Sequence, residues 1–261
     1  MPFPTFAPVD GVKRPPVELT RQQIASRLGL HRAGVEKIID AGMLEHPFMA
    51  SEVDAMANRQ RLGVVEGELT VLRTDAWADA DLTEKPWRRY IGFHTTLSNG
   101  ELEATSLRWW RSTVETVLGN ELFAVTVATF PVALYRITGH LGSFTREGEK
   151  HQRHHYEGQL LARVHPGMKV RLEADIPEHL KTPTRQVMES RIVVNSGGPI
   201  GYLKPGISVG DLIRTVQRHR GMSISQIAET LEQPLQMVEK ALNGKAGYES
   251  WRRPLTDLLG T

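Results

Sequence analysis

The stretch Gln226-Ile-Ala-Glu-Thr-Leu231, followed by Val238-Glu-Lys240, is the key to this chain because it occurs twice. Its counterpart near the other end is Gln23-Ile-Ala-Ser-Arg-Leu28, followed by Val35-Glu-Lys37. The two copies lie 203 residues apart, and the spacing within each copy is the same. We therefore interpret the chain as carrying one supersecondary unit near each end.

A helix-start pattern precedes each copy, Thr20-Arg-Gln-Gln23 in one and Ser223-Ile-Ser-Gln226 in the other. In such a capping box the hydroxyl accepts a hydrogen bond from the third backbone N–H, and the glutamine side chain reaches back to the start of the helix. Both patterns predict the beginning of a short helix whose apolar residues face inward.

The composition is that of an ordinary globular protein, with 40% apolar and 24% charged residues, and 261 residues suffice for two or three domains. The net charge is only +2, so a nucleic-acid partner would need a local basic face, with which the pI of 8.9 is compatible. Cysteine is absent, which excludes disulfides, thiolate nucleophiles and the usual structural zinc sites. We expect no membrane span, because no run of 18 apolar residues occurs, and a cytoplasmic location.

We expect residues 1–17 to be a flexible, proline-rich arm that is not a signal peptide, and residues 18–62 to form the first domain. Within it, Ile24 and Leu28 share one helical face, and Gly29 is placed to end that helix in the left-handed conformation. A second helix is predicted from His31 to Ala41, closed by Gly42.

Two short helices joined by a tight turn, with small Ala25 in the first and branched Val35 ten positions later, resemble the helix-turn-helix family of transcription regulators. An apolar, hairpin-like segment from Met43 to Phe48 and a helix from about Ser51 to Arg61 are similar to the winged excisionase and MerR-like subgroup. The resemblance implies that the second helix enters the major groove of DNA. It assigns base or phosphate contacts to His31, Arg32, Ala33, Glu36 and Lys37, and backbone contacts to Arg21 and Gln22. A generic helical hairpin with a solvated basic face is the alternative.

Residues 207–261 form the second predicted domain, with a helix opening at Ser208-Val-Gly-Asp211 and repeat helices at about Ser225–Glu232 and Leu235–Leu242. The arrangement resembles the repressor-type helix-turn-helix domain, which implies DNA contacts by Gln236, Lys240, Asn243 and Lys245. This copy departs from the family pattern, because Glu232 stands where a turn glycine is usual. A protein-interaction or dimerisation role is therefore an alternative. We expect the tail, with Trp251 and Leu255, to cap this domain or that of a partner.

Residues 63–206 are β-rich, and alternating or β-branched runs bounded by turn residues mark the strands. The runs begin at Leu69, Arg89, Phe123, Val132, Gln159, Lys169 and Arg191. Asn99-Gly100 is read as a turn, Glu101 to about Arg111 as a helix, and Ser196–Gly201 as a linker. Pro177 suggests a turn after a strand. The fold class is therefore α+β, with two small all-helical domains flanking an open barrel or highly curved sheet.

The middle domain is faintly similar to the PUA-like and EVE-like barrels, some of which hold bases in an aromatic pocket. The similarity lies in the order of a helix ending in Trp109-Trp110-Arg and the strands after it. Candidates for a stacking pocket are Trp87, Trp109, Trp110 and Tyr156, although tryptophans in a β domain are commonly core residues. The polar stretch Lys150–His155 is a loop that binds phosphate, binds metal through His151 and His155, or is simply solvated.

No nucleophile elbow, Walker loop or dinucleotide-binding glycine pattern occurs, so we expect no catalytic residues, no metal and no cofactor. The sequence predicts a double-stranded DNA-binding transcriptional regulator, most plausibly a repressor. A regulator whose middle domain senses a ligand or a modified base is the main alternative, and a nuclease or base-processing barrel is a third. Whether the chain forms a homodimer is left open, and no membrane partner is expected.

Overall fold

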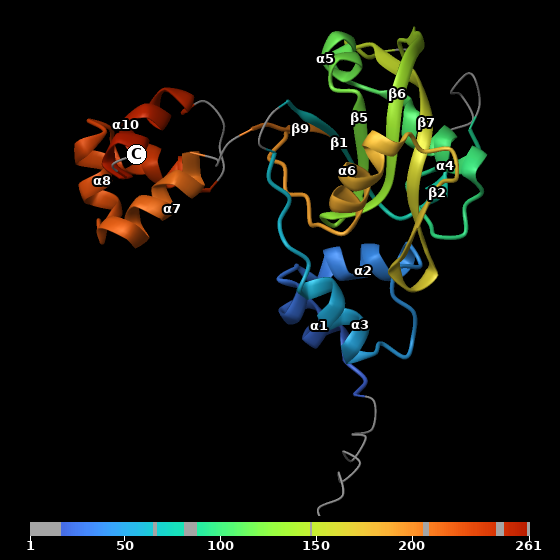
Figure 1. Cartoon of the computed structure of the whole chain (residues 1–261), viewed down its shortest axis with the longest axis horizontal. Coiled ribbons are helices and arrows are strands. Elements are labelled where there is room, and N and C mark those ends of the chain that lie inside the picture. The colour runs from blue at the N-terminus through green and yellow to red at the C-terminus, as the bar shows by residue number, and fades with distance from the viewer. Residues whose placement is uncertain are drawn as a thin grey trace, which may run out of the picture.

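The computed structural model describes residues 17–64, 67–80, 88–146, 148–205, 209–243 and 248–259. Nearly all of the expected arm lies outside these ranges. The chain is mixed α+β, with a curved sheet, three helices beneath it and a separate helical cluster at the C-terminal end (Figure 1).

The first three helices are α1 (Arg21–Leu28), α2 (Arg32–Asp40) and α3 (Ala50–Ala57). The capping box at the start of α1 is confirmed: the Gln23 N–H donates to Thr20 Oγ1 at 3.3 Å, and the Thr20 N–H donates to Gln23 Oε1 at 2.9 Å. Gly29 ends α1 in the left-handed conformation, as its position predicts. Buried Ile24, Val35 and Ile38 hold α1 and α2 together.

The hairpin expected from Met43 to Phe48 is wrong. The chain there follows turns, and Phe48 pairs with the segment that enters α1: the Leu19 N–H donates to the Phe48 carbonyl at 2.8 Å. The Ala50 N–H likewise donates to the Val17 carbonyl at 2.8 Å. The apolar residues that suggested a hairpin are instead buried beneath the helices.

Seven strands form the main sheet, in the order β4-β7-β6-β5-β1-β9, with β8 also paired to β7. Their bounds are β1 Leu69–Thr74, β4 Arg108–Trp110, β5 Leu122–Val127, β6 Phe130–Phe144, β7 Arg153–His165, β8 Lys169–Leu172 and β9 Ile200–Leu203. β1 and β5 run parallel, and the other neighbours run antiparallel. A second sheet pairs β2 (Ala78–Asp79) with β3 (Tyr90–Ile91), and a short 3₁₀ helix spans Pro166–Met168.

Two expected strands are wrong. The run from Arg89 contributes only β3, and Arg191 forms a single bridge, to Arg61. The expected linker Ser196–Gly201 instead leads into β9, because its last residues pair with β1.

Three helices accompany the sheet: α4 (Asn99–Leu107), α5 (Val114–Gly119) and α6 (Glu178–Met188). The turn expected at Asn99-Gly100 is wrong, because Ser98 and Glu101 form a capping box that starts α4 there. Trp109 and Trp110 belong to β4 rather than to the end of this helix. The backbone becomes extended at Arg108, which pairs with His155 of β7. The turn that Pro177 suggested at the end of a strand is confirmed, because residues 174–175 turn after β8 ends at Leu172, and Pro177 itself is the N-cap of α6.

The C-terminal cluster contains α7 (Val209–Arg220), α8 (Ile224–Thr230), α9 (Leu235–Leu242), a 3₁₀ turn (Glu249–Trp251) and α10 (Arg252–Leu259). The second capping box is confirmed, with the Gln226 N–H donating to Ser223 Oγ at 3.2 Å. Ser208, expected to cap α7, lies outside the described residues. Trp251 and Leu255 are buried against the cluster, so the tail caps its own helices as expected.

Buried apolar residues of the described chain fall into two groups. One group runs from Leu19 to Ile200 and joins α1, α2 and α3 to the sheet in one continuous core. The other runs from Val209 to Leu255 and is made by the C-terminal helices alone. Among the described residues, α2 therefore packs against the sheet, whereas α9 packs within the C-terminal cluster.

Candidate nucleic-acid interface

The two helix pairs share the details of their turn. In the first pair the Leu30 N–H donates to the Ala25 carbonyl at 3.0 Å, and in the second the Gln233 N–H donates to the Ala228 carbonyl at 2.9 Å. Because each bond links equivalent positions, the second helix of each pair leaves the turn in the same way. The structure thus places α2 and α9 in equivalent positions within their pairs.

Both second helices present polar side chains outward. On α9, Gln236, Lys240 and Asn243 are exposed, whereas Lys245 lies outside the described residues. On α2, His31, Arg32 and Ala33 are exposed at or near its start, and Glu36 and Lys37 are half-buried. The predicted residues of α2 divide between its two flanks, because the sheet covers part of one side.

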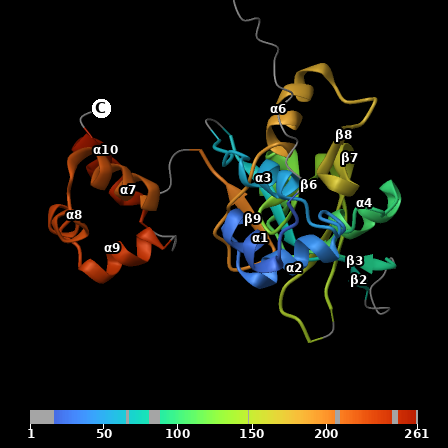
Figure 2. The ribbon, with the colours of Figure 1, turned by 90° about the horizontal axis from the view of Figure 1, so that it is seen from below.

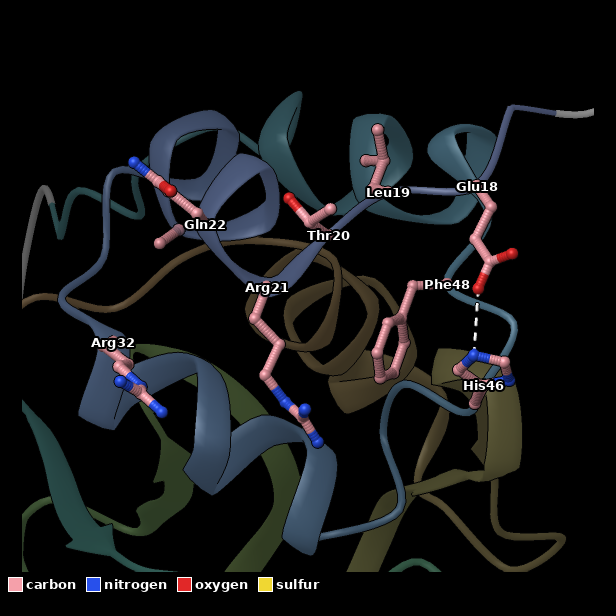
Figure 3. Close-up of a pocket in the computed structure, with 9 residues that line it drawn as sticks. Glu18, Leu19, Thr20, Arg21, Gln22, Arg32, His46 and Phe48 are labelled. Atoms are coloured by element: carbon pink, nitrogen blue, oxygen red, sulfur yellow. Dashed lines mark ion pairs between the residues drawn. The ribbon is translucent and has the colours of Figure 1, made fainter.

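One flank of α2 forms a shallow hollow of about 930 Å³ with the start of α1 (Figure 3). Arg21 and Gln22 of α1 and Arg32 of α2 line it, so the structure brings these three predicted residues together. The Arg21 guanidinium lies 5.9 Å from the centre of the Phe48 ring. Across the hollow, His46 Nε2 lies 2.9 Å from Glu18 Oε1 (Figure 3).

Both arginines of the hollow approach the same carboxylate. Arg21 Nε lies 3.3 Å from Glu36 Oε2, and Arg32 Nε lies 3.7 Å from Glu36 Oε1. Two cations therefore share the Glu36 carboxylate, while Glu18 adds a second carboxylate across the hollow. The Arg32 side chain is 87% exposed, so its ion pair is of the weak, solvent-screened kind that a phosphate can replace.

The other flank of α2 faces the sheet across a cleft of about 530 Å³. His31, Ala33 and Lys37 line it from α2, and the end of β1 lines it from the sheet. Lys37 Nζ forms an ion pair with Asp75, which follows β1. Figure 2 shows α2 from below, between α1 on one side and the β2–β3 strands on the other.

Arg191 fastens this arrangement, and the sequence analysis missed its role. Its guanidinium donates to the Leu28 carbonyl at 2.9 Å and to Thr129 Oγ1 at 3.2 Å, and lies 5.0 Å from the centre of the Phe130 ring. Partial burial lowers the pKa of Arg191. The residue therefore ties the end of α1 to the β5–β6 turn. No local sequence pattern predicts such a contact, because Leu28 and Thr129 lie far from Arg191 in the sequence.

The residues proposed for an aromatic pocket do not form one open surface. Trp109 is only 4% exposed and lies 5.6 Å, between ring centres, from each of Phe144 and His155. Tyr156 is fully buried; its hydroxyl oxygen lies 2.7 Å from Ser112 Oγ, and burial raises the pKa of Tyr156.

Trp110 is half-buried and donates its indole N–H to the Ser106 carbonyl at 2.8 Å, and Trp87 lies outside the described residues. A different tryptophan, Trp77, is 39% exposed and stacks on His94 with the ring centres 4.8 Å apart. The sequence analysis missed Trp77, because nothing in its neighbourhood distinguishes it from a core residue.

The polar stretch Lys150–His155 leads into β7, which contains His154 and His155. His154 Nδ1 lies 2.9 Å from Ser143 Oγ, and the His154 and His140 ring centres are 5.4 Å apart. Burial and the neighbouring His140 lower the pKa of His154. Among the described residues, no group of three or more histidine, aspartate or glutamate side chains is placed to hold a metal ion.

Comparisons with protein-family models, curated proteins and solved structures each found no match to this chain. In the part of the chain that the structure describes, no helix combines the length and apolar character needed to cross a bilayer.

Proposed function

We propose that this protein binds double-stranded DNA in a sequence-specific manner through two helix-turn-helix units, α1–α2 and α8–α9, and acts as a transcriptional regulator, most plausibly a repressor. The observation that carries this proposal is the repeated helix pair. Each copy has a capping box, a matching turn hydrogen bond and outward polar side chains on its second helix. A helix of this diameter fits the major groove, whose base edges such side chains read.

In this proposal α9 is the more accessible of the two recognition helices. The side chains of Gln236 and Asn243 suit the donor–acceptor pattern of adenine, and Lys240 suits guanine or phosphate. All three are exposed, and among the residues that the structure describes α9 packs within the C-terminal cluster. We therefore assign to α9 a larger share of base recognition than to α2.

The first unit contributes mainly contacts to the DNA backbone. Arg21, Gln22 and Arg32 lie together at the starts of α1 and α2, where long cationic and amide side chains suit phosphate oxygens. His31 and Ala33 are exposed at the start of α2, on the flank that faces the sheet, and reach bases only there. The cover that the sheet gives to the far flank makes a full-length insertion of α2 unfavourable, so Lys37 on that flank is assigned a phosphate contact rather than a base contact.

Two unlike units on one chain provide a recognition mode that a symmetric dimer lacks. Once one unit is bound, the other experiences a raised effective concentration of neighbouring DNA, provided that the linker lets both engage. The expected target is a pair of unlike half-sites. Occupation of such a site would block polymerase without any chemical step.

Selection of bound duplexes from fragmented host DNA, followed by electrophoretic retardation, tests the proposal. Lys240→Ala and Arg32→Ala should each weaken binding of the selected site while the protein stays folded. Lys181→Ala is a matched control, because Lys181 is an exposed, ion-paired lysine on α6. Failure to enrich any duplex, or equal binding by all three variants, would refute the proposal.

A second candidate is a regulator that senses a small molecule or a modified base. The cleft between α2 and the sheet favours it, because a ligand there would touch a reading helix and the β-rich domain together. Thermal shift measurements with a ligand library and with oligonucleotides carrying modified bases would test it. Stabilisation by a compound that also alters DNA retardation is the expected result.

A further inference from the structure

Lys37, a predicted DNA contact, is already engaged inside the protein. Its ammonium group pairs with the carboxylate of Asp75 across the cleft between α2 and the sheet. The Lys37 side chain is 44% exposed and that of Asp75 is 68% exposed, so both groups are reachable from solvent. A phosphate that approaches α2 on this flank meets a lysine whose charge is already matched.

The backbone around Asp75 is well fixed. The Phe93 N–H donates to the Asp75 carbonyl at 3.0 Å, and a Cβ at Gly92 would lie 2.4 Å from the Ala76 carbonyl oxygen. The chain after Gly92 also reaches α2, since the Thr95 N–H donates to the Ala41 carbonyl at 3.0 Å. One tight connection therefore positions the carboxylate of Asp75 and contacts the end of the helix that carries Lys37.

We propose that Asp75 is a built-in competitor for DNA phosphate, an autoinhibitory contact that Lys37 must leave before it binds DNA. This inference rests on the proposed DNA-binding function. Asp75 offers the same kind of partner as a phosphate oxygen: an anion that Lys37 reaches without any rearrangement of α2. Phosphate replaces it only where other contacts bring the duplex close, so the pair suppresses weak, non-specific association.

The size of the effect follows from the exposure of the pair. Exposed ion pairs contribute little, and the usual range of about 0.2–1 kcal/mol corresponds to about a 1.4- to 5-fold change in an equilibrium constant. Removal of the Asp75 charge should therefore tighten DNA binding by about 1.4- to 5-fold. The gain should shrink as salt is raised, because both the ion pair and the phosphate contact are screened.

The test compares Asp75→Asn with the wild-type full chain in binding to the selected duplex. Asp79→Asn is the matched control: Asp79 is exposed on β2, four positions away, and forms no ion pair with any described residue. Each aspartate variant is also made in a Lys37→Ala background. Tighter binding by Asp75→Asn alone, lost when Lys37 is absent, is the expected result. Circular dichroism and a second variant, Asp75→Ser, show whether the fold is retained.

Two outcomes would overturn the inference. If Asp75→Asn binds the duplex no more tightly than wild type, Asp75 does not compete. If Asp75→Asn and Asp79→Asn tighten binding equally, or if the gain persists without Lys37, the effect is a general change in charge. Absence of duplex binding by the wild-type chain is a different failure, because it refutes the proposed function itself.

Discussion

Gly29 and Glu232 lie at the same position of the two helix pairs, and both have left-handed backbone angles, with φ of 61° and 52° respectively. Glycine adopts this conformation without a Cβ clash, whereas a glutamate there is strained. The turn geometry is therefore a requirement of the helix pair, which the second copy meets with an unsuitable residue. The second helix pair therefore contains backbone strain at Glu232 that the first pair, with Gly29 at this position, does not have.

Replacement of the strained residue should stabilise the second unit. Glu232→Gly removes a left-handed glutamate, whose strain costs roughly 1–2 kcal/mol, and adds unfolded-chain entropy, so the net gain should be about 0.5–1 kcal/mol. Chemical denaturation monitored by circular dichroism measures it. The reciprocal change, Gly29→Ala, should destabilise the first unit. A Cβ there meets no atom within 4 Å, so the loss comes from the strained left-handed backbone and not from a steric clash. A loss of stability in Glu232→Gly would contradict this account.

Glu36 holds two arginines that the proposed function needs. Glu36→Gln should free Arg21 and Arg32 from their ion pair and strengthen DNA binding, by roughly 0.5–1 kcal/mol at low salt. Fluorescence anisotropy with labelled duplex at two salt concentrations measures the change. Glu178→Gln, which frees Lys181 on α6, is the control. Weaker binding by Glu36→Gln would instead indicate that Glu36 orients the arginines.

Arg191 should contribute strongly to stability. Arg191→Ala removes the hydrogen bonds to Leu28 and Thr129, and bonds from charged donors contribute about 1.5–3 kcal/mol, so a loss on the order of 2 kcal/mol is expected. Arg191→Lys should lose nearly as much, because an ammonium group lacks the planar fork that serves both partners. Urea denaturation measures both. Wild-type stability of the lysine variant would show that charge alone suffices.

Stability should fall as the solution is acidified. Burial lowers the pKa of His154, His155 and His165, so the fold favours the neutral imidazoles. Their contribution is complete above the unfolded pKa of about 6.5 and is lost as the pH falls through that value toward the folded pKa. Denaturation midpoints at pH 7.5 and pH 5 should differ. The difference should be smaller in His154→Gln than in the control His151→Gln, where the exposed side chain lies before β7. Equal midpoints in the wild type would refute the prediction.

Short-range patterns predicted the helix starts well. The capping boxes at Thr20 and Ser223 set these starts with residues three positions apart, so the sequence contains the whole signal. The same pattern at Ser98 was overlooked because Asn99-Gly100 suggested a turn. Where two local signals compete, the hydrogen bonds that each one satisfies decide the outcome.

Long-range contacts could not be predicted in this way. β9 exists because Ile200–Leu203 pairs with β1, more than a hundred residues earlier. Arg191 and Leu28 meet across 163 positions, and Asp75 reaches Lys37 because the end of β1 faces α2 across the cleft. Such long-range contacts follow from the order of the strands in the sheet. The periodicity of the sequence does not predict that order.

The common core beneath α1, α2 and the sheet has a consequence for how this architecture can be exchanged between chains. Leu28 and Ile38 are buried in the same cluster as Phe130 of β6. Transfer of the first three helices alone to another protein would therefore expose their apolar side chains to solvent. The described residues from Val17 to Pro205 and those from Val209 onward have separate buried apolar clusters, and the Arg61–Asp211 ion pair at 3.6 Å crosses between them. Recombination in a gene encoding this protein would preserve foldable products when it cuts between those two blocks.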